Sequence, residues 1–230
     1  MILANHGIIS SSGGLPPLNI GLVSMYKAES NANDSFGTNN GTAQGGLTYA
    51  TGKSVDSFVF NGTNSYVQLP EDSMRFNDSF SVEFWLKTSS NQSSVKGLFG
   101  DYYYGSNGYG YVVFINPDST VGIYWRNGST DNDFSSTTSV VLNQWNHICV
   151  TWDKVNTNFK IYLNGTLSNQ VTNANANNIT YAVGSNRTNI GTFNSNSSNV
   201  LNGAMDEIGV WNKVLTQSEI TELQTKYYPF

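Results

Sequence analysis

The sequence predicts an all-β protein built as an antiparallel two-sheet sandwich with one short C-terminal helix. Many short apolar stretches recur at regular intervals along the 230 residues, and this spacing is typical of sandwiches. Gly, Asn and Ser separate the stretches, and these residues favour turns. A helix signal stands out only near the end of the chain.

Alternation of apolar and polar residues locates the central strands. In residues 79–87 (SFSVEFWLK), the side chains of Phe80, Val82 and Phe84 fall on one face of a strand, and residues 145–152 (WNHICVTW) alternate in the same way. Further strands are expected at residues 21–26, 55–60, 65–69, 95–104, 109–115, 120–126, 158–163 and 188–192.

Turn residues connect these strands. Asn127-Gly128 and Asn164-Gly165 are dipeptides that favour tight turns between antiparallel strands. We expect a hairpin around residues 61–64 (NGTN) and loops at residues 34–42 and 173–187, which are polar and lack periodicity.

The stretch at residues 201–223 contains the last strand and the helix. Within residues 205–210, Met205, Ile208 and Val210 are the apolar residues, which suits a strand with at least one buried face. Thr216 and Glu219 form a capping box, and Leu215 and Ile220 occupy the two positions of a hydrophobic staple. A strand this late in the chain needs a neighbour, so we expect it to pair with the first strand.

The composition restricts the range of partners. Charged residues make up 12% of the chain, with 11 Lys and Arg against 16 Asp and Glu, and a net charge of -5. Nucleic-acid binding and electrostatic membrane anchoring both need clustered basic residues, so we expect neither. A single cysteine excludes an intrachain disulfide. No stretch has the pattern of a signal peptide or a membrane span.

Two regions of different character divide the chain. Residues 1–20 combine a Ser/Gly run with Pro16-Pro17 and form an expected N-terminal arm, while residues 21–230 form the sandwich domain. The arm is interpreted either as a frayed terminus or as a segment that docks on a partner through Ile8, Ile9 and Leu15.

The order of motifs resembles the laminin-G-like branch of the concanavalin A-like lectin/glucanase superfamily. The resemblance extends over most of the predicted domain and implies a jelly-roll topology with the first and last strands adjacent. The matching motifs are at residues 21–26, 34–37, 58–62, 66–70, 80–86, 145–148, 152–153, 161–165 and 205–211.

The catalytic motif of this superfamily is missing from the sequence. Its glucanases carry the pattern E-x-D-x-x-E on one strand face, but Glu83 and Glu207 have no carboxylate at that spacing. We therefore predict no catalytic residue and no enzyme activity. His147 and Cys149 could form a nucleophile pair, yet two buried strand residues are the preferred interpretation.

The resemblance also implies a Ca²⁺ site. Similar sandwiches hold the ion between an Asp on the last strand and oxygens of early loops, positions that match Asp206, the carbonyl of Gly62 and Asp34. The alternative is that Asp206 accepts hydrogen bonds from neighbouring backbone N–H groups.

Tyrosines cluster at residues 101–111 (DYYYGSNGYGY), where flat rings with polar tips suit stacking on sugar rings. A sandwich core with an aromatic hairpin tip, or an oligomer interface, would explain the same pattern. The predicted ligand-binding residues are Tyr102, Tyr103, Tyr104 and Tyr109, together with Trp125, Arg126, Asp131 and Asp133 on the next strand and an expected polar loop.

The sequence thus favours a non-catalytic binding or adhesion module for a cell-surface or mucus polysaccharide. We expect it on the surface of a bacteriophage virion, made in the host cytoplasm without a signal peptide. There it would be oligomeric and contact other virion proteins through residues 1–20. The alternatives are a purely structural virion component and a glycan-cleaving enzyme.

Overall fold

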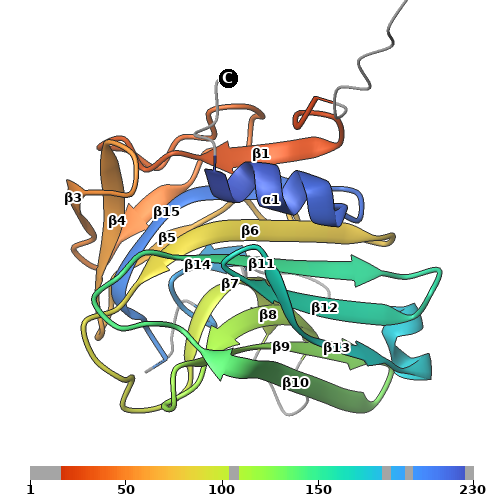
Figure 1. The fold of residues 1–230 in the computed structure, drawn as a ribbon. Coiled ribbons are helices and arrows are strands. Elements are labelled where there is room, and N and C mark those ends of the chain that lie inside the picture. The colour runs from red at the N-terminus through yellow and green to blue at the C-terminus, as the bar shows by residue number, and fades with distance from the viewer. Residues whose placement is uncertain (1–16, 104–108, 183–187, 195–198, 226–230) are drawn as a thin grey trace, which may run out of the picture.

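The computed structural model describes residues 17–103, 109–182, 188–194 and 199–225. These residues form two antiparallel sheets that pack face to face (Figure 1). The strands of sheet A are β1 (Leu22–Tyr26), β3 (Thr48–Thr51), β4 (Asp56–Asn61), β6 (Phe80–Lys87), β11 (Asn146–Asp153), β12 (Asn158–Leu163), β13 (Thr166–Thr172) and β15 (Asn202–Trp211). The strands of sheet B are β2 (Thr42–Gln44), β5 (Tyr66–Gln68), β7 (Lys96–Tyr103), β8 (Tyr109–Ile115), β9 (Thr120–Asn127), β10 (Thr130–Ser139) and β14 (Thr188–Ile190).

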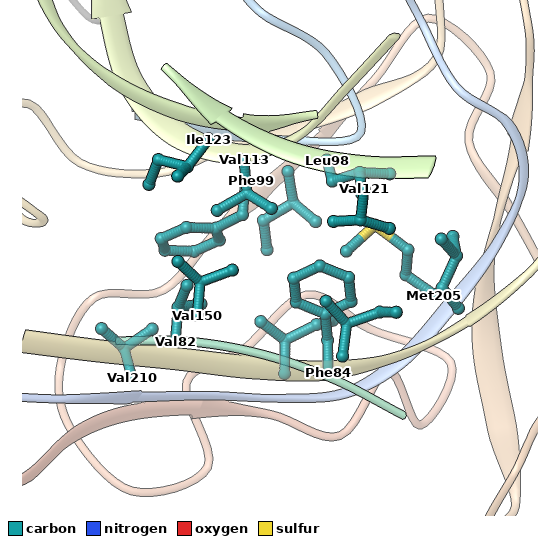
Figure 2. Packing of buried hydrophobic residues seen from close by; sticks show 14 of the residues in the cluster. Val82, Phe84, Leu98, Phe99, Val113, Val121, Ile123, Val150, Met205 and Val210 are labelled. Carbon is teal, nitrogen blue, oxygen red and sulfur yellow. The ribbon is translucent and has the colours of Figure 1, made fainter. Parts of the chain in front are cut away.

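The order of strands in sheet A is β13-β12-β11-β6-β15-β4-β3, and β1 pairs with β15 outside this order. The order in sheet B is β10-β9-β8-β7-β14-β5-β2. Alternate side chains of both sheets meet in one apolar core, where Phe84 and Val150 of sheet A face Val113 and Ile123 of sheet B (Figure 2). Burial of each such side chain contributes about 1.5–3 kcal/mol to folding. The predicted two-sheet antiparallel jelly-roll sandwich is confirmed.

The two ends of the sandwich domain lie side by side. β1 pairs antiparallel with the last half of β15, with Leu22 opposite Trp211 and Tyr26 opposite Ile208. The first half of β15 pairs instead with β4, and β6 runs along its other side. The Trp211 indole N–H donates to the Leu18 carbonyl at 2.8 Å, which fixes the chain just before β1. The predicted pairing of first and last strands is therefore confirmed.

Helix α1 (Gln217–Thr225) covers the outer face of sheet A next to β1 and β6 (Figure 1). The Glu219 carboxylate accepts the Thr216 N–H at 2.8 Å, and the Thr216 hydroxyl accepts the Glu219 N–H at 3.3 Å, as the capping box predicts. Leu215 and Ile220 are buried with Trp211 beneath the helix. No helix in the described part of the chain has the length and apolarity to cross a membrane.

The expected hairpin at residues 55–69 does not form, because its two strands belong to different sheets. β4 pairs with β3 and β15, whereas β5 pairs with β2 and β14. The Asn61 side-chain oxygen accepts the N–H groups of Thr63 at 2.9 Å and Asn64 at 3.0 Å. This local turn carries the chain from one sheet to the other instead of folding it back on the same sheet.

The polar region after Asn127-Gly128 is also a strand and not the expected loop. β10 extends sheet B at its edge and pairs with β9 from Thr130 onward. Its later residues reach the edge of sheet A, where the Thr137 hydroxyl donates to the Ser168 carbonyl at 2.7 Å. The loop expected at residues 173–187 contains the short 3₁₀ helix η1 (Ala174–Asn177). Most of the N-terminal arm, residues 1–16, lies outside the described residues.

Candidate functional site

The outer face of sheet B carries a cluster of aromatic side chains. Along β8 and β9 the core receives alternate residues, such as Val113 and Ile123, so Phe114 and Tyr124 point to the opposite face. Phe114 is only 7% exposed on this face, since neighbouring side chains cover it.

Four rings form the cluster. Tyr102 of β7 meets Tyr124 edge to face, with ring centroids 5.1 Å apart. Phe193, in the segment after β14, lies 5.7 Å from Tyr102 and 6.3 Å from Phe114. Strands β7, β8 and β9 therefore each supply one ring to a wall that continues into a loop.

A pocket of about 260 Å³ opens beside these rings. Its polar side chains are Asn116, Asp133 and Asn199. The Asn116 amide nitrogen donates to Thr120 Oγ1 at 3.0 Å and to Ser135 Oγ at 2.9 Å, which leaves its carbonyl oxygen as an acceptor. The pocket is lined by Val95, Tyr102, Val112, Phe114, Asn116, Tyr124, Asp133, Phe193 and Asn199.

A glycine makes room for the pocket floor. A Cβ atom on Gly122 would lie 2.3 Å from Phe114 Cζ and 2.7 Å from Ser135 Oγ. Only a residue without a side chain therefore lets the Phe114 ring lie across β9.

Next to the pocket, a hydrogen-bonded group fixes three polar side chains. Asp131 Oδ1 accepts from the Tyr124 hydroxyl and from Arg126 Nη1, and Arg126 Nε donates to the Gly128 carbonyl at 3.1 Å. Burial and the Asp131 hydrogen bond raise the pKa of Tyr124, so its hydroxyl stays protonated. The Arg126 guanidinium also lies over the Tyr109 ring, 5.4 Å from its centroid.

Four of the eight residues predicted to bind a ligand line the pocket or belong to the adjacent group. Tyr102 and Asp133 line the pocket, and Arg126 and Asp131 form the adjacent group. Tyr103 is 36% exposed. The Tyr103 ring stacks against the ring of Tyr109, another predicted residue, with ring centroids 6.4 Å apart. Tyr104 lies outside the described residues.

Trp125 does not belong to this surface. Its side chain is 1% exposed and packs in the core against Phe159, at a centroid distance of 4.5 Å. Its indole N–H donates to the Asn175 carbonyl at 3.1 Å. A ring buried in this way cannot stack on a ligand, so we remove Trp125 from the candidate site.

Sequence reasoning missed Phe114, Tyr124 and Phe193. A signal for Tyr124 was available, because Ile123 and Trp125 share one face of β9, which places Tyr124 and Arg126 on the other. No comparable signal points to Phe193, since its loop position reaches the pocket only through the pairing of β14 with β7.

The residues matched to a Ca²⁺ site do not fit a metal centre. Asp206 Oδ2 accepts the N–H groups of Lys53 at 2.7 Å and Ser54 at 3.0 Å. Asp34 accepts the backbone N–H groups of Met25 and Gly37. N–H groups directed at a carboxylate oxygen oppose a cation there, so these carboxylates stabilise backbone turns.

Gly62 lies apart from Asp206. The Gly62 N–H donates to the Leu201 carbonyl. Leu201 lies five positions before Asp206, and five residues of extended strand span about 16 Å. Among the described residues, no three His, Cys, Asp or Glu side chains are placed to hold a metal ion together.

A second group of titratable residues is buried on the outer side of sheet A. His147 Nε2 lies 2.7 Å from Glu83 Oε2, and both side chains are fully buried. Burial raises the pKa of Glu83 and lowers that of His147 to about 3, so burial favours the neutral form of both side chains. Cys149 is buried and its pKa is raised, which agrees with packed strand residues and opposes an activated thiolate.

The fold and topology define a jelly-roll lectin-like domain, and the sequence comparison identifies its family. The family model of the concanavalin A-like lectin/glucanases superfamily, in its laminin G form, matches residues 61–221. This is more than half of the chain, so the protein belongs to this superfamily. A comparison with curated protein sequences gives no significant match.

Several solved structures share the fold. Domain 4 of AbnA, a GH43 extracellular arabinanase from Geobacillus stearothermophilus in complex with arabinotriose, is 24% identical. It has a TM-score of 0.71, and the match covers 88% of this chain and 98% of that one. The binding domain of Paraclostridial Mosquitocidal Protein 1 is 18% identical, with a TM-score of 0.69. The match covers 90% of this chain and 52% of that one. The Ruminococcus gnavus IT-sialidase CBM40, bound to α2,3 sialyllactose, is 15% identical, with a TM-score of 0.59. The match covers 79% of this chain and 97% of that one.

Proposed function

We propose that the protein is a non-catalytic glycan-binding module and that its ligand occupies the pocket on the outer face of sheet B. The observation that carries this proposal is the combination of four aromatic rings with oxygen acceptors around one opening. Aromatic rings pack against the C–H face of a sugar, while acceptors bind its hydroxyl groups.

Proteins of the same fold support this assignment. The AbnA domain is described with arabinotriose and the CBM40 with sialyllactose. Their identities of 24% and 15% establish the shared fold alone. The pocket residues must therefore supply the argument for carbohydrate binding.

The arrangement of carboxylates favours binding over cleavage. Glycoside hydrolysis uses two carboxylates on opposite sides of the scissile bond. Asp133 lines the pocket, but the nearby Asp131 is paired with Arg126 and Tyr124 through its Oδ1 atom. Release of reducing sugar from a polysaccharide by the purified protein would contradict a non-catalytic role.

The proposal is tested by glycan-array binding, followed by titration calorimetry with the best-bound glycan. Tyr102→Ala is expected to weaken binding by at least about tenfold, because it removes one ring from the pocket wall. Tyr103→Ala is the matched control: the same residue type at the next position, outside the pocket lining, should leave affinity unchanged. Thermal unfolding of both variants verifies that they fold. Equal losses in the two variants would contradict the pocket, and no glycan binding by wild type would contradict the function.

Gly122→Ala tests the shape of the pocket without removing a ring. The new methyl group must displace Phe114, since its Cβ would lie 2.3 Å from Phe114 Cζ. The displaced ring enters the pocket, and we expect roughly tenfold weaker glycan binding with a fold that remains intact. Calorimetry and a melting curve measure the two effects separately, and an unchanged affinity would show that the ligand lies elsewhere.

The wider setting of the module stays a prediction. Location on a bacteriophage virion, contacts through residues 1–20 and oligomeric assembly follow from the sequence composition and from an arm that lies mostly outside the described residues. Mass spectrometry of purified particles would test the location. Presence of the chain in particles without any glycan binding would favour the purely structural alternative.

A further inference from the structure

We propose that the pocket accepts a single uncharged sugar residue and discriminates against sialic and uronic acids. This inference rests on the proposed glycan-binding function and specifies its substrate class. It follows from the charges around the pocket, the hydrogen-bonding groups at its wall and its size.

The first argument is charge. None of the nine lining residues is Lys or Arg, and one of them, Asp133, carries an exposed carboxylate. Lys96 follows Val95 in the sequence but is 5% exposed and does not line the pocket. An acidic sugar would therefore bring its carboxylate toward a like charge.

Arg126 lies beside the pocket, but its Nε and Nη1 atoms already have partners. Its side chain is 5% exposed and paired with Asp131, and its Nε atom donates to the Gly128 carbonyl. Recognition of a carboxylate by arginine generally uses two parallel N–H donors. Forming them here would break the contacts with Asp131 and Gly128. The Arg126–Asp131 pair cancels its own charge. Among the described residues that line the pocket or form this pair, Asp133 therefore supplies the net charge.

The second argument is the direction of the hydrogen bonds. Asp133 presents carboxylate oxygens, and the donors of the Asn116 amide are used by Thr120 and Ser135. These two residues thus offer acceptors. Hydroxyl groups of a neutral sugar can donate to such atoms, whereas a carboxylate of the ligand can only accept.

The third argument is size. A volume of about 260 Å³ lies below the range of about 300–1,000 Å³ that is typical for drug-sized ligands. The pocket therefore suits one sugar ring.

The test uses the full chain on an array of matched glycan pairs that differ only by a sialic or uronic acid residue. Calorimetry then follows with the best-bound pair. We expect the neutral member to bind at least about tenfold more tightly at low salt, with the gap narrowing at high salt because screening weakens repulsion. Asp133→Lys should narrow or reverse the preference, whereas Asp78→Lys, an exposed change outside the pocket lining, should not.

The outcomes separate this inference from the function on which it rests. Binding of acidic members as tightly as, or more tightly than, their neutral partners would overturn the inference and leave glycan binding standing. An unchanged preference in Asp133→Lys would overturn the charge argument. Absence of binding to every glycan would overturn the proposed function itself.

Discussion

Asp206→Ala is expected to lower the free energy of unfolding by about 2–3 kcal/mol. The fully buried carboxylate accepts three backbone N–H groups, from Lys53, Ser54 and Glu207. Each lost charge-assisted bond costs about 1 kcal/mol or more. Burial raises the pKa of Asp206 to about 6. Removing the buried charge therefore returns part of its desolvation cost, and the net effect is smaller than the sum. Urea unfolding at pH 6.5 measures the change.

Asp118→Ala is the control for this variant. Its carboxylate accepts one backbone N–H, from Thr120 at 3.0 Å, in an exposed turn, so we expect a loss below about 1 kcal/mol. The same samples test the calcium prediction. We expect the wild-type melting temperature to be equal in EDTA and in Ca²⁺. A Ca²⁺-dependent rise that disappears in Asp206→Ala would reinstate the metal site.

Wild-type stability is expected to fall as the pH rises from about 7 to 9. Burial, then Asp206 and Glu83, raise the pKa of Glu207 to about 8 from its ordinary value of 4.5. The folded protein therefore keeps a proton that the unfolded chain releases, and this contribution is lost as the pH rises through the folded pKa. With a folded pKa of about 8, the expected loss between pH 7 and 9 is about 1.4 kcal/mol.

Other groups around Glu207 set the window for this experiment. Lys27 partly offsets the repulsion, while Glu29 adds to it. Asp206, whose pKa is raised to about 6, has largely finished titrating at pH 7. His147 has a pKa lowered to about 3. The stability that depends on neutral His147 rises with pH. This rise is nearly complete above the pKa of histidine in the unfolded chain, about 6.5. Glu83 changes stability in the same direction as Glu207.

Glu207→Gln tests the assignment. The amide keeps the shape of the side chain but does not titrate, so its unfolding free energy should vary less between pH 7 and 9 than that of the wild type. Glu71→Gln, on the surface, should retain the wild-type profile. If Glu207→Gln followed the wild-type curve, the alkaline loss would belong to another group.

Local patterns predicted much of the fold because they depend on residues close in sequence. Alternation in residues 79–87 located β6, and the capping box at Thr216 and Glu219 located the start of α1. The Asn164-Gly165 dipeptide located the β12–β13 turn, where both residues have positive φ angles. The late position of the last strand and the resemblance to the family both predicted the pairing of β1 with β15.

The same patterns could not assign strands to sheets. Apolar runs on either side of residues 61–64 fit a hairpin. The Asn61 side-chain oxygen, however, accepts the N–H groups of Thr63 and Asn64, and this turn directs the chain to the second sheet. The expected polar loop at Asp131 and Asp133 is a strand because pairing with β9 compensates for its low apolar content.

The sequence by itself determined the sandwich class, the partnership of its first and last strands, and the candidate residues Tyr102, Arg126, Asp131 and Asp133. Only the tertiary structure decided which face of β9 meets the core, and so placed Trp125 inside and Tyr124 at the pocket. It also brought Phe193 to Tyr102. The physical reason is that alternation fixes which side chains share a face, whereas long-range packing decides which face is buried.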